Sequence, residues 1–306
     1  MTNLDKDFYI ENGYIVFKKL ISHQKIDYLL DEFDNFKNNG SIYYSQSHHN
    51  WRSCKEDTDD FGLLECSIEN FTDLFWAKKL RKLGLEILLS DEINECLSSI
   101  SDSNEFAMWQ NMFFDKSVGT ADHFDSWYLD TDPPGNLVGA WIALEDIDGN
   151  GGSFHIYPKS HTVDFSDTYF MVHDDFLKFS KKEKNKFAKV ELKINKGDVV
   201  FWHPNLLHGS SLQNISGCSR KSLTAHYFPV THKKTIGGFK GTISDATAES
   251  YKSEVKKQLR MMKTFGYKIA TKKNKLIFFD SLRGYIKFKL NFRNGVRWLM
   301  GRDNYK

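Results

Sequence analysis

The run Leu137-Val138-Gly139-Ala140-Trp141-Ile142-Ala143-Leu144, followed by the turn residues Asp148-Gly149-Asn150-Gly151-Gly152, indicates the fold most clearly. An apolar run bounded by such turns is typical of a β-strand. Four more segments share this character: 106–114, 190–194, 199–202 and 222–228. Short strands separated by turns are typical of a β-sandwich or a closed jelly-roll barrel. We therefore predict a mainly β fold with flanking helices and a jelly-roll core.

The segment before the strands is predicted to be mixed. Residues 8–21 favour a short strand, and Ser22 is a helix N-cap residue type. Apolar residues then recur at helical spacing, which predicts an amphipathic helix over 23–38. Residues 39–62 are polar and are expected to form a long loop that could cover a site, and a second helix fits 72–89.

Charge is distributed unevenly along the 306 residues. The net charge is only +2, which argues against a dedicated nucleic-acid-binding protein. Residues 252–306 nevertheless carry 16 Lys and Arg against 3 Asp and Glu, and they return to helical spacing. We predict a catalytic domain over 1–245, with helices before a β core that starts near 104, and a basic helical extension over 246–306.

Several roles stay open for the basic extension. It could be a solvated helical face, an attraction for an anionic or carrier-linked substrate, a weak contact with a membrane surface, or a homodimer contact. The N-terminus lacks the pattern of a signal peptide, no apolar run is long enough to span a membrane, and the four cysteines form no CxxC pair. These features predict a cytoplasmic protein with reduced thiols.

The segment Asp122-His123-Phe124-Asp125 carries the clearest chemistry. In a strand, His123 and Asp125 would point to the same side. His208, which follows a strong strand, is the natural third ligand. Two imidazoles and one carboxylate leave open positions on a metal, as in non-haem Fe(II) oxygenases. Arg220 lies downstream at the start of the next strand, where a guanidinium could hold a dicarboxylate through two hydrogen bonds.

The chain also resembles the phytanoyl-CoA dioxygenase (PhyH-type) family of Fe(II)/2-oxoglutarate oxygenases over about residues 8–230. The matching motifs are Asn12-Gly13-Tyr14-Ile15-Val16, His123-Phe124-Asp125-Ser126-Trp127-Tyr128, Trp141-Ile142-Ala143-Leu144-Glu145-Asp146-Ile147, Asn150-Gly151-Gly152, Pro158-Lys159-Ser160-His161, Gly197-Asp198-Val199-Val200-Phe201, His208-Gly209-Ser210, Asn214, Ser216 and Arg220.

This resemblance implies a double-stranded β-helix of the cupin-like type and a set of site residues. The iron ligands would be His123, Asp125 and His208. Arg220 would hold the distal carboxylate of 2-oxoglutarate, and the other residues expected near this cosubstrate are Ser210, Trp141, Met112 and Lys116.

Three departures from the family pattern accompany the resemblance. Phe124 stands where many relatives have Gln, and Lys159 replaces a Gly. The segment between His208 and Arg220 is one residue longer than in relatives, which leaves Lys221 as an alternative clamp. We prefer Arg220, because a guanidinium can bind a carboxylate through two parallel hydrogen bonds.

The expected function is therefore that of an Fe(II)- and 2-oxoglutarate-dependent dioxygenase. It would use O2 to hydroxylate a small-molecule metabolite and release succinate and CO2. Asp125 favours hydroxylation over halogenation, because halogenating relatives have a small residue there. Desaturation, cyclisation and epimerisation at the same iron stay open, and a non-catalytic cupin-like binding protein is the alternative from another class.

Overall fold

The computed structural model describes residues 3–45, 50–71, 74, 76–165, 168, 173–235 and 267–269. Its main element is a seven-stranded antiparallel sheet in the order β1-β10-β7-β12-β5-β14, with β4 also paired to β5. The strands are β1 (Tyr14–Phe17), β4 (Ile68–Glu69), β5 (Phe106–Phe114), β7 (Val138–Ala143), β10 (Val199–Trp202), β12 (Ser222–Pro229) and β14 (Tyr267–Ile269).

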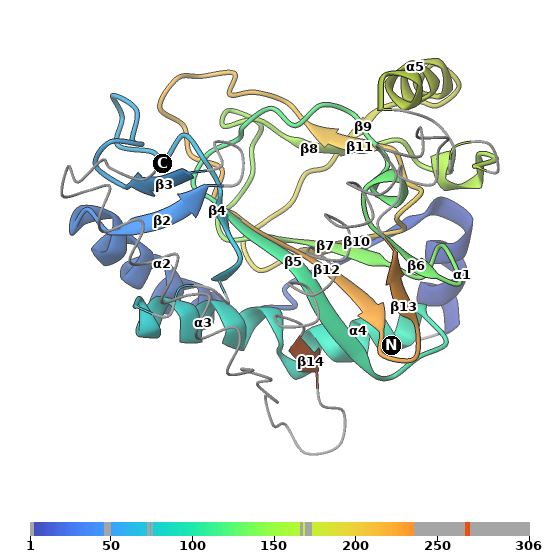
Figure 1. The fold of residues 1–306 in the computed structure, drawn as a ribbon, viewed down its shortest axis with the longest axis horizontal. Helices are drawn as coiled ribbons and strands as arrows, with labels where there is room; N and C mark the ends of the chain where they lie inside the picture. Colours follow the sequence, from blue (N-terminus) through green and yellow to red (C-terminus); the bar gives the residue numbers. More distant parts are fainter. Residues whose placement is uncertain are drawn as a thin grey trace, which may run out of the picture.

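A smaller sheet lies across from the large one (Figure 1). It has the order β11-β8-β9, with β8 (Phe154–Ile156), β9 (Val190–Glu191) and β11 (His208–Ser210). Two further pairs are β2 (Ile42–Ser45) with β3 (Asn50–Ser53), and β6 (Asp130–Asp132) with β13 (Lys233–Thr235). Two facing antiparallel layers confirm the predicted mainly β fold with a jelly-roll core.

Helices cover the outer face of the large sheet. They are α1 (Asn3–Asn12), α2 (His23–Asn38), α3 (Lys78–Leu88) and α4 (Asp91–Ile100), and Figure 1 shows α2, α3 and α4 along this face. Phe33 of α2 packs against Phe113 of β5, with ring centroids 4.2 Å apart. The Ser22 side chain accepts from Lys25 N, as its N-cap role predicts. The predicted helix over 23–38 is therefore confirmed.

Strand β12 shows how the two faces of the large sheet differ. Leu223, Ala225 and Tyr227 belong to the core shared with the helices. Ser222, Thr224 and His226 alternate with them and are also buried. Because successive side chains point to opposite faces, these polar residues face the interior between the two sheets. The strand is thus buried on both faces, and its interior face is the one available for chemistry.

Several segments differ from the sequence prediction. The stretch expected as a strand over 8–21 is helix α1 up to Asn12, and only Tyr14–Phe17 forms a strand. Gly13 joins them with φ of +78°, a conformation that favours glycine. The predicted loop over 39–62 contains the β2–β3 hairpin, and the predicted helix over 72–89 begins only at Lys78. The remaining helices are α5 (His173–Lys184) and two short 3₁₀ helices, η2 (Asp125–Trp127) and η3 (Ser160–Thr162).

Only three residues of the basic extension are described. Tyr267–Ile269 form β14 and pair with β5, whereas the sequence predicted helix there. The rest of 246–306 lies outside the described residues, so the domain division and the proposed roles of the extension stay predictions. His48 and His49, in the predicted loop over 39–62, also lie outside the described residues. Within the described part of the chain, no helix is long and apolar enough to cross a membrane. All four cysteines are free.

Candidate functional site

His123 and His208 are joined directly through their backbones. They form an isolated antiparallel bridge, in which each residue donates its N–H to the carbonyl of the other. Directly paired residues project their side chains on the same side. The two imidazoles accordingly lie close together, with ring centroids 4.4 Å apart.

The same local pattern fixes the tautomer of both rings. Nδ1 of His123 lies 2.8 Å from the carbonyl oxygen of Ala121, and Nδ1 of His208 lies 2.9 Å from that of Leu206. A carbonyl can only accept, so each Nδ1 carries a proton and Nε2 is the nitrogen left to bind a metal. This is the arrangement that a metal-binding histidine needs.

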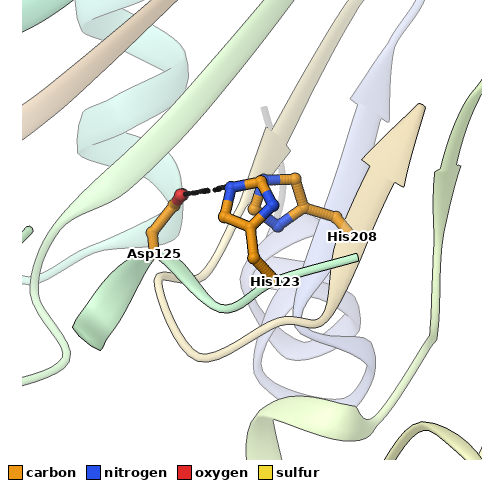
Figure 2. Close-up of side chains that lie close together, drawn as sticks. All are labelled: His123, Asp125 and His208. Atoms are coloured by element: carbon orange, nitrogen blue, oxygen red, sulfur yellow. Dashed lines mark ion pairs between the residues drawn. The ribbon is translucent and has the colours of Figure 1, made fainter. Parts of the chain in front are cut away.

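Asp125 completes the group. Its Oδ1 lies 3.3 Å from Nε2 of His123 and 3.7 Å from Nε2 of His208. Figure 2 shows the three side chains converging. One ligand atom from each residue falls within 4.8 Å of the other two, so a single metal ion could contact all three. The predicted triad is therefore brought together in space.

The route by which His123 and Asp125 converge differs from the prediction. We expected both residues in one strand, but His123 is in the bridge to His208 and Asp125 begins the 3₁₀ helix η2. The backbone N–H of Ser126 bonds to the carbonyl of Pro204, which ties the turn to the segment before His208. A tight turn anchored at both ends, rather than strand alternation, aims the two side chains together.

Sequence reasoning missed the residues that orient Asp125. Its Oδ2 accepts a hydrogen bond of 2.8 Å from the indole Nε1 of Trp202 and lies 3.2 Å from Nε2 of His226. These groups come from β10 and β12, and they hold one carboxylate oxygen so that the other faces the imidazoles. The alternating pattern of both strands could have indicated these residues, but only if it were known which face of each strand is the interior.

A second polar cluster holds the residue before His123. The Asp122 carboxylate pairs with His155 of β8, with Lys184 of α5, and with the hydroxyl of Tyr157 at 3.0 Å. His155 is thus committed to this cluster. The cluster ties the turn carrying His123 to the smaller sheet and to α5.

Electrostatics favour the metal-binding protonation states of His208 and Asp125. For His123, burial opposes protonation, but the hydrogen bond and the charge of Asp125 outweigh it and raise the pKa of this imidazole. Burial lowers the pKa of His208 to about 4, so its imidazole is neutral at pH 7. Burial opposes ionisation of Asp125, but the imidazoles of His208 and His226 outweigh it and hold the pKa of this carboxyl well below its usual range. A neutral imidazole and an ionised carboxylate are the forms that ligate a metal.

Arg220 is a buried cation whose N–H groups are not all used. Its side chain is buried, and Nε and Nη1 have no hydrogen-bond partner among the described residues. The guanidinium carbon lies 5.8 Å from the Trp141 ring centre and 5.9 Å from that of Phe114. Burial lowers the pKa of Arg220 to about 10, so it stays charged at pH 7. A buried charge without a partner is costly, and an anionic ligand would satisfy it.

The neighbouring Lys221 is engaged elsewhere. Its Nζ lies 3.4 Å from Asp115 Oδ1 and 4.0 Å from Glu145 Oε2. The Lys221 ammonium is therefore already paired with carboxylates, whereas Nε and Nη1 of Arg220 have no hydrogen-bond partner among the described residues. Of the two alternatives that the sequence left open, this geometry favours Arg220 as the clamp.

The remaining residues expected near the cosubstrate are placed as follows. Trp141 is buried, stacks on Phe154 at 5.5 Å between ring centres, and lies beneath the Arg220 guanidinium. Ser210 is buried next to His208 and accepts from Thr120 N at 2.9 Å. Trp141 therefore lies next to the Arg220 guanidinium, and Ser210 lies next to the triad residue His208.

Met112 and Lys116 lie on or just after β5. Met112 pairs with Thr224, which pairs with Trp141 on the other side, so Met112 shares the interior face. Lys116 forms ion pairs with Asp59 at 2.7 Å and Glu65 at 3.9 Å. Its ammonium is thus already neutralised by carboxylates of the 57–65 loop.

Comparison with known proteins gives one family and a set of distant relatives. The family model of phytanoyl-CoA dioxygenase (PhyH) matches residues 9–222. The peroxisomal phytanoyl-CoA dioxygenase of Bos taurus is 26% identical over 245 residues, which cover 72% of this chain and 67% of that protein.

Solved structures share the fold at low sequence identity. The non-heme alpha ketoglutarate dependent carbocyclase SnoK from nogalamycin biosynthesis has a TM-score of 0.60 at 17% identity, covering 81% of this chain and 90% of its own. The epimerase SnoN in complex with Fe3+, alpha ketoglutarate and nogalamycin RO has a TM-score of 0.56 at 16% identity, covering 79% and 90%.

Proposed function

The chain belongs to the phytanoyl-CoA dioxygenase (PhyH) family of Fe(II)/2-oxoglutarate oxygenases, and from this premise we propose that it hydroxylates a small-molecule metabolite. The membership confirms the resemblance inferred from the sequence. The reaction would consume 2-oxoglutarate and O2 and release succinate and CO2. Our proposal thus concerns the class of substrate, a small molecule, and the outcome of the oxidation, a hydroxylation.

The convergence of the triad is the observation that carries this proposal. Two imidazoles and one carboxylate offer ligand atoms within 4.8 Å of one another, and in both imidazoles Nδ1 is engaged with a backbone carbonyl, which leaves Nε2 for the metal. This donor set fits Fe(II) and occupies one face of the ion, which leaves positions for a keto acid and O2. When bound, the iron supplies the oxygen activation and electron transfer that protein side chains cannot perform.

The other residues have roles that follow from their contacts. Arg220 would bind the distal carboxylate of 2-oxoglutarate through its unpartnered N–H groups. The flat face of Trp141 beneath the guanidinium would restrict where that carboxylate can lie. Trp202 and His226 would keep Asp125 Oδ1 directed at the metal, because they hold Oδ2.

The test is succinate release by purified protein with Fe(II), 2-oxoglutarate and O2 across a substrate library. We expect succinate from the wild type and none above background from His123→Ala or His208→Ala, because either change removes a ligand. Chelation of the iron should abolish release and added Fe(II) should restore it. Retained turnover in either variant would refute the ligand assignment.

The mass of the product distinguishes the oxidative outcomes. Hydroxylation adds one oxygen atom to the substrate, desaturation and cyclisation remove two hydrogen atoms, and epimerisation leaves the mass unchanged. Asp125 supports hydroxylation over halogenation, because a carboxylate stands where halogenating relatives have a small residue, and the product mass tests hydroxylation against the other outcomes. No succinate at all, with intact 2-oxoglutarate binding, would instead indicate a binding protein.

A cytoplasmic location is also proposed, because all four cysteines are free, as is typical of proteins in a reducing compartment. The Bos taurus relative is peroxisomal by name, so cell fractionation of the full chain tests this point.

A further inference from the structure

Glu69 is a partly buried acid on the interior face of the large sheet. It lies in β4 and pairs with Met112 of β5, while the preceding Ile68 pairs with Phe113. Ile68 and Phe113 belong to the core beneath the helices. Because side chains alternate between faces, Glu69 and Met112 point to the opposite side, toward the smaller sheet.

This position places Glu69 in line with the proposed site. A row of directly paired residues crosses the sheet from Glu69 through Met112 and Thr224 to Trp141. Trp141 lies beneath the Arg220 guanidinium. Directly paired residues on one face are about 5 Å apart, so the Glu69 side chain begins only three strands from Trp141.

The proposed iron site lies beside the same face, two residues further along β12 than the row of paired residues. His226 follows Thr224 by two residues on the same face and contacts Asp125 Oδ2 at 3.2 Å. Two residues along a strand correspond to about 7 Å. Glu69 therefore lies on the interior face that also carries the contacts to Asp125 and to the guanidinium, but at the opposite edge of the sheet from β1.

The carboxyl group of Glu69 has unused hydrogen-bonding capacity. Its Oε2 is buried without a hydrogen-bond partner among the described residues. Burial raises its pKa to about 7, and a hydrogen bond with Ser67 offsets this only in part. A buried carboxyl oxygen without a partner is costly, and a bound hydrogen-bond donor would remove that cost.

Three lysines around the C-terminal end of β5 are paired with carboxylates other than Glu69. Lys116 pairs with Asp59, while Lys37 and Lys221 pair with Asp115. Arg220 thus presents a positive charge on this interior face, and Glu69 presents a carboxyl group that a neighbouring cation would keep ionised. An anionic cosubstrate suits the first, and a positively charged substrate suits the second.

We propose that Glu69 is a substrate-binding residue that recognises a protonated amine on the small molecule to be oxidised. This inference rests on the proposed oxygenase function and adds a substrate class to it. An ionised carboxylate only accepts hydrogen bonds, and an ammonium group supplies both donors and the opposite charge.

The experiment uses primary amines of low molecular mass, each matched with its N-acetyl derivative. Succinate release is measured with wild-type protein, Glu69→Gln and the control Glu56→Gln, whose side chain is exposed. We expect amines, and not their N-acetyl derivatives, to stimulate release by the wild type and the control. In Glu69→Gln, kcat/KM for the amine should fall about 10- to 100-fold, the range for losing a charge-assisted hydrogen bond.

Anaerobic binding of 2-oxoglutarate to the Fe(II) protein is measured in parallel. If the wild type does not bind 2-oxoglutarate, the proposed function itself fails. If it binds 2-oxoglutarate but amines give no stimulation, or Glu69→Gln behaves like Glu56→Gln, the assignment of Glu69 is overturned. A change in 2-oxoglutarate affinity without a change in amine preference would also overturn it, because Glu69 would then act on the cosubstrate.

Discussion

His123 and His208 exchange two backbone hydrogen bonds, with N···O distances of 3.0 and 3.1 Å. Two ligands from distant parts of the chain are therefore fixed relative to each other by the main chain rather than by side-chain packing. Such a bridge sets the separation of the two imidazoles before any metal binds, which reduces the ordering that metal binding requires.

The bridge predicts a strong effect of Gly209→Ala. A Cβ at this position would lie 2.8 Å from Asp122 Oδ1 and 2.9 Å from the carbonyl oxygen of Thr120, so the backbone would have to move. We expect the dissociation constant for Fe(II), measured anaerobically by calorimetry, to rise at least about tenfold. Leu212→Ala, at an exposed side chain, is the control. Equal affinities in the two variants would contradict a rigid bridge.

Trp202→Phe tests the orientation of Asp125. The change removes the N–H that donates to Asp125 Oδ2 but keeps an aromatic ring in the core. Loss of such a partner weakens metal affinity by about 10- to 100-fold, and we expect a loss in this range. Trp109→Phe, in a separate aromatic cluster with Phe228, controls for the general cost of trimming a buried indole. An unchanged Fe(II) affinity would show that His226 alone orients the Asp125 carboxylate.

Arg220→Lys tests the clamp. The substitution keeps a positive charge but loses the planar fork, so the KM for 2-oxoglutarate should rise about tenfold or more. Lys221→Met should leave this KM nearly unchanged, because the Lys221 ammonium pairs with Asp115 and Glu145. Initial rates of succinate formation provide both values. The reverse ranking of the two variants would move the clamp to Lys221.

His203 predicts a loss of stability in acid. Burial, with a smaller contribution from His161, lowers the pKa of His203 to about 3. Between pH 6.5 and 3 the unfolded chain binds a proton that the native protein does not, so stability falls as the pH drops below about 6.5.

The comparison with His203→Gln isolates this contribution. Between pH 7 and pH 5, the wild type should lose about 1–2 kcal/mol more free energy of unfolding than the variant. Urea titrations at the two pH values measure the difference. Parallel losses in both proteins would show that His203 is not the group responsible.

The sequence by itself predicted the main strands, the helix over 23–38 and the three triad residues that the structure brings together. Apolar runs such as 137–144 and 199–202 form strands because turn residues bound them, and local patterns of this kind need no tertiary information. The N-terminal helix was missed, because α1 has no clear amphipathic pattern and its exposed Leu4 and Ile10 reveal no buried face.

Only the tertiary structure decided which face of each strand is the interior. β12 is buried on both faces, so the polar set with His226 could not be separated from the outward-facing set by hydropathy alone. The choice between Arg220 and Lys221, the orientation of Asp125 by Trp202, and the place of Glu69 all depend on that face. Each is a contact between residues distant in the chain, and the pairing of strands, which local sequence does not encode, brings them together.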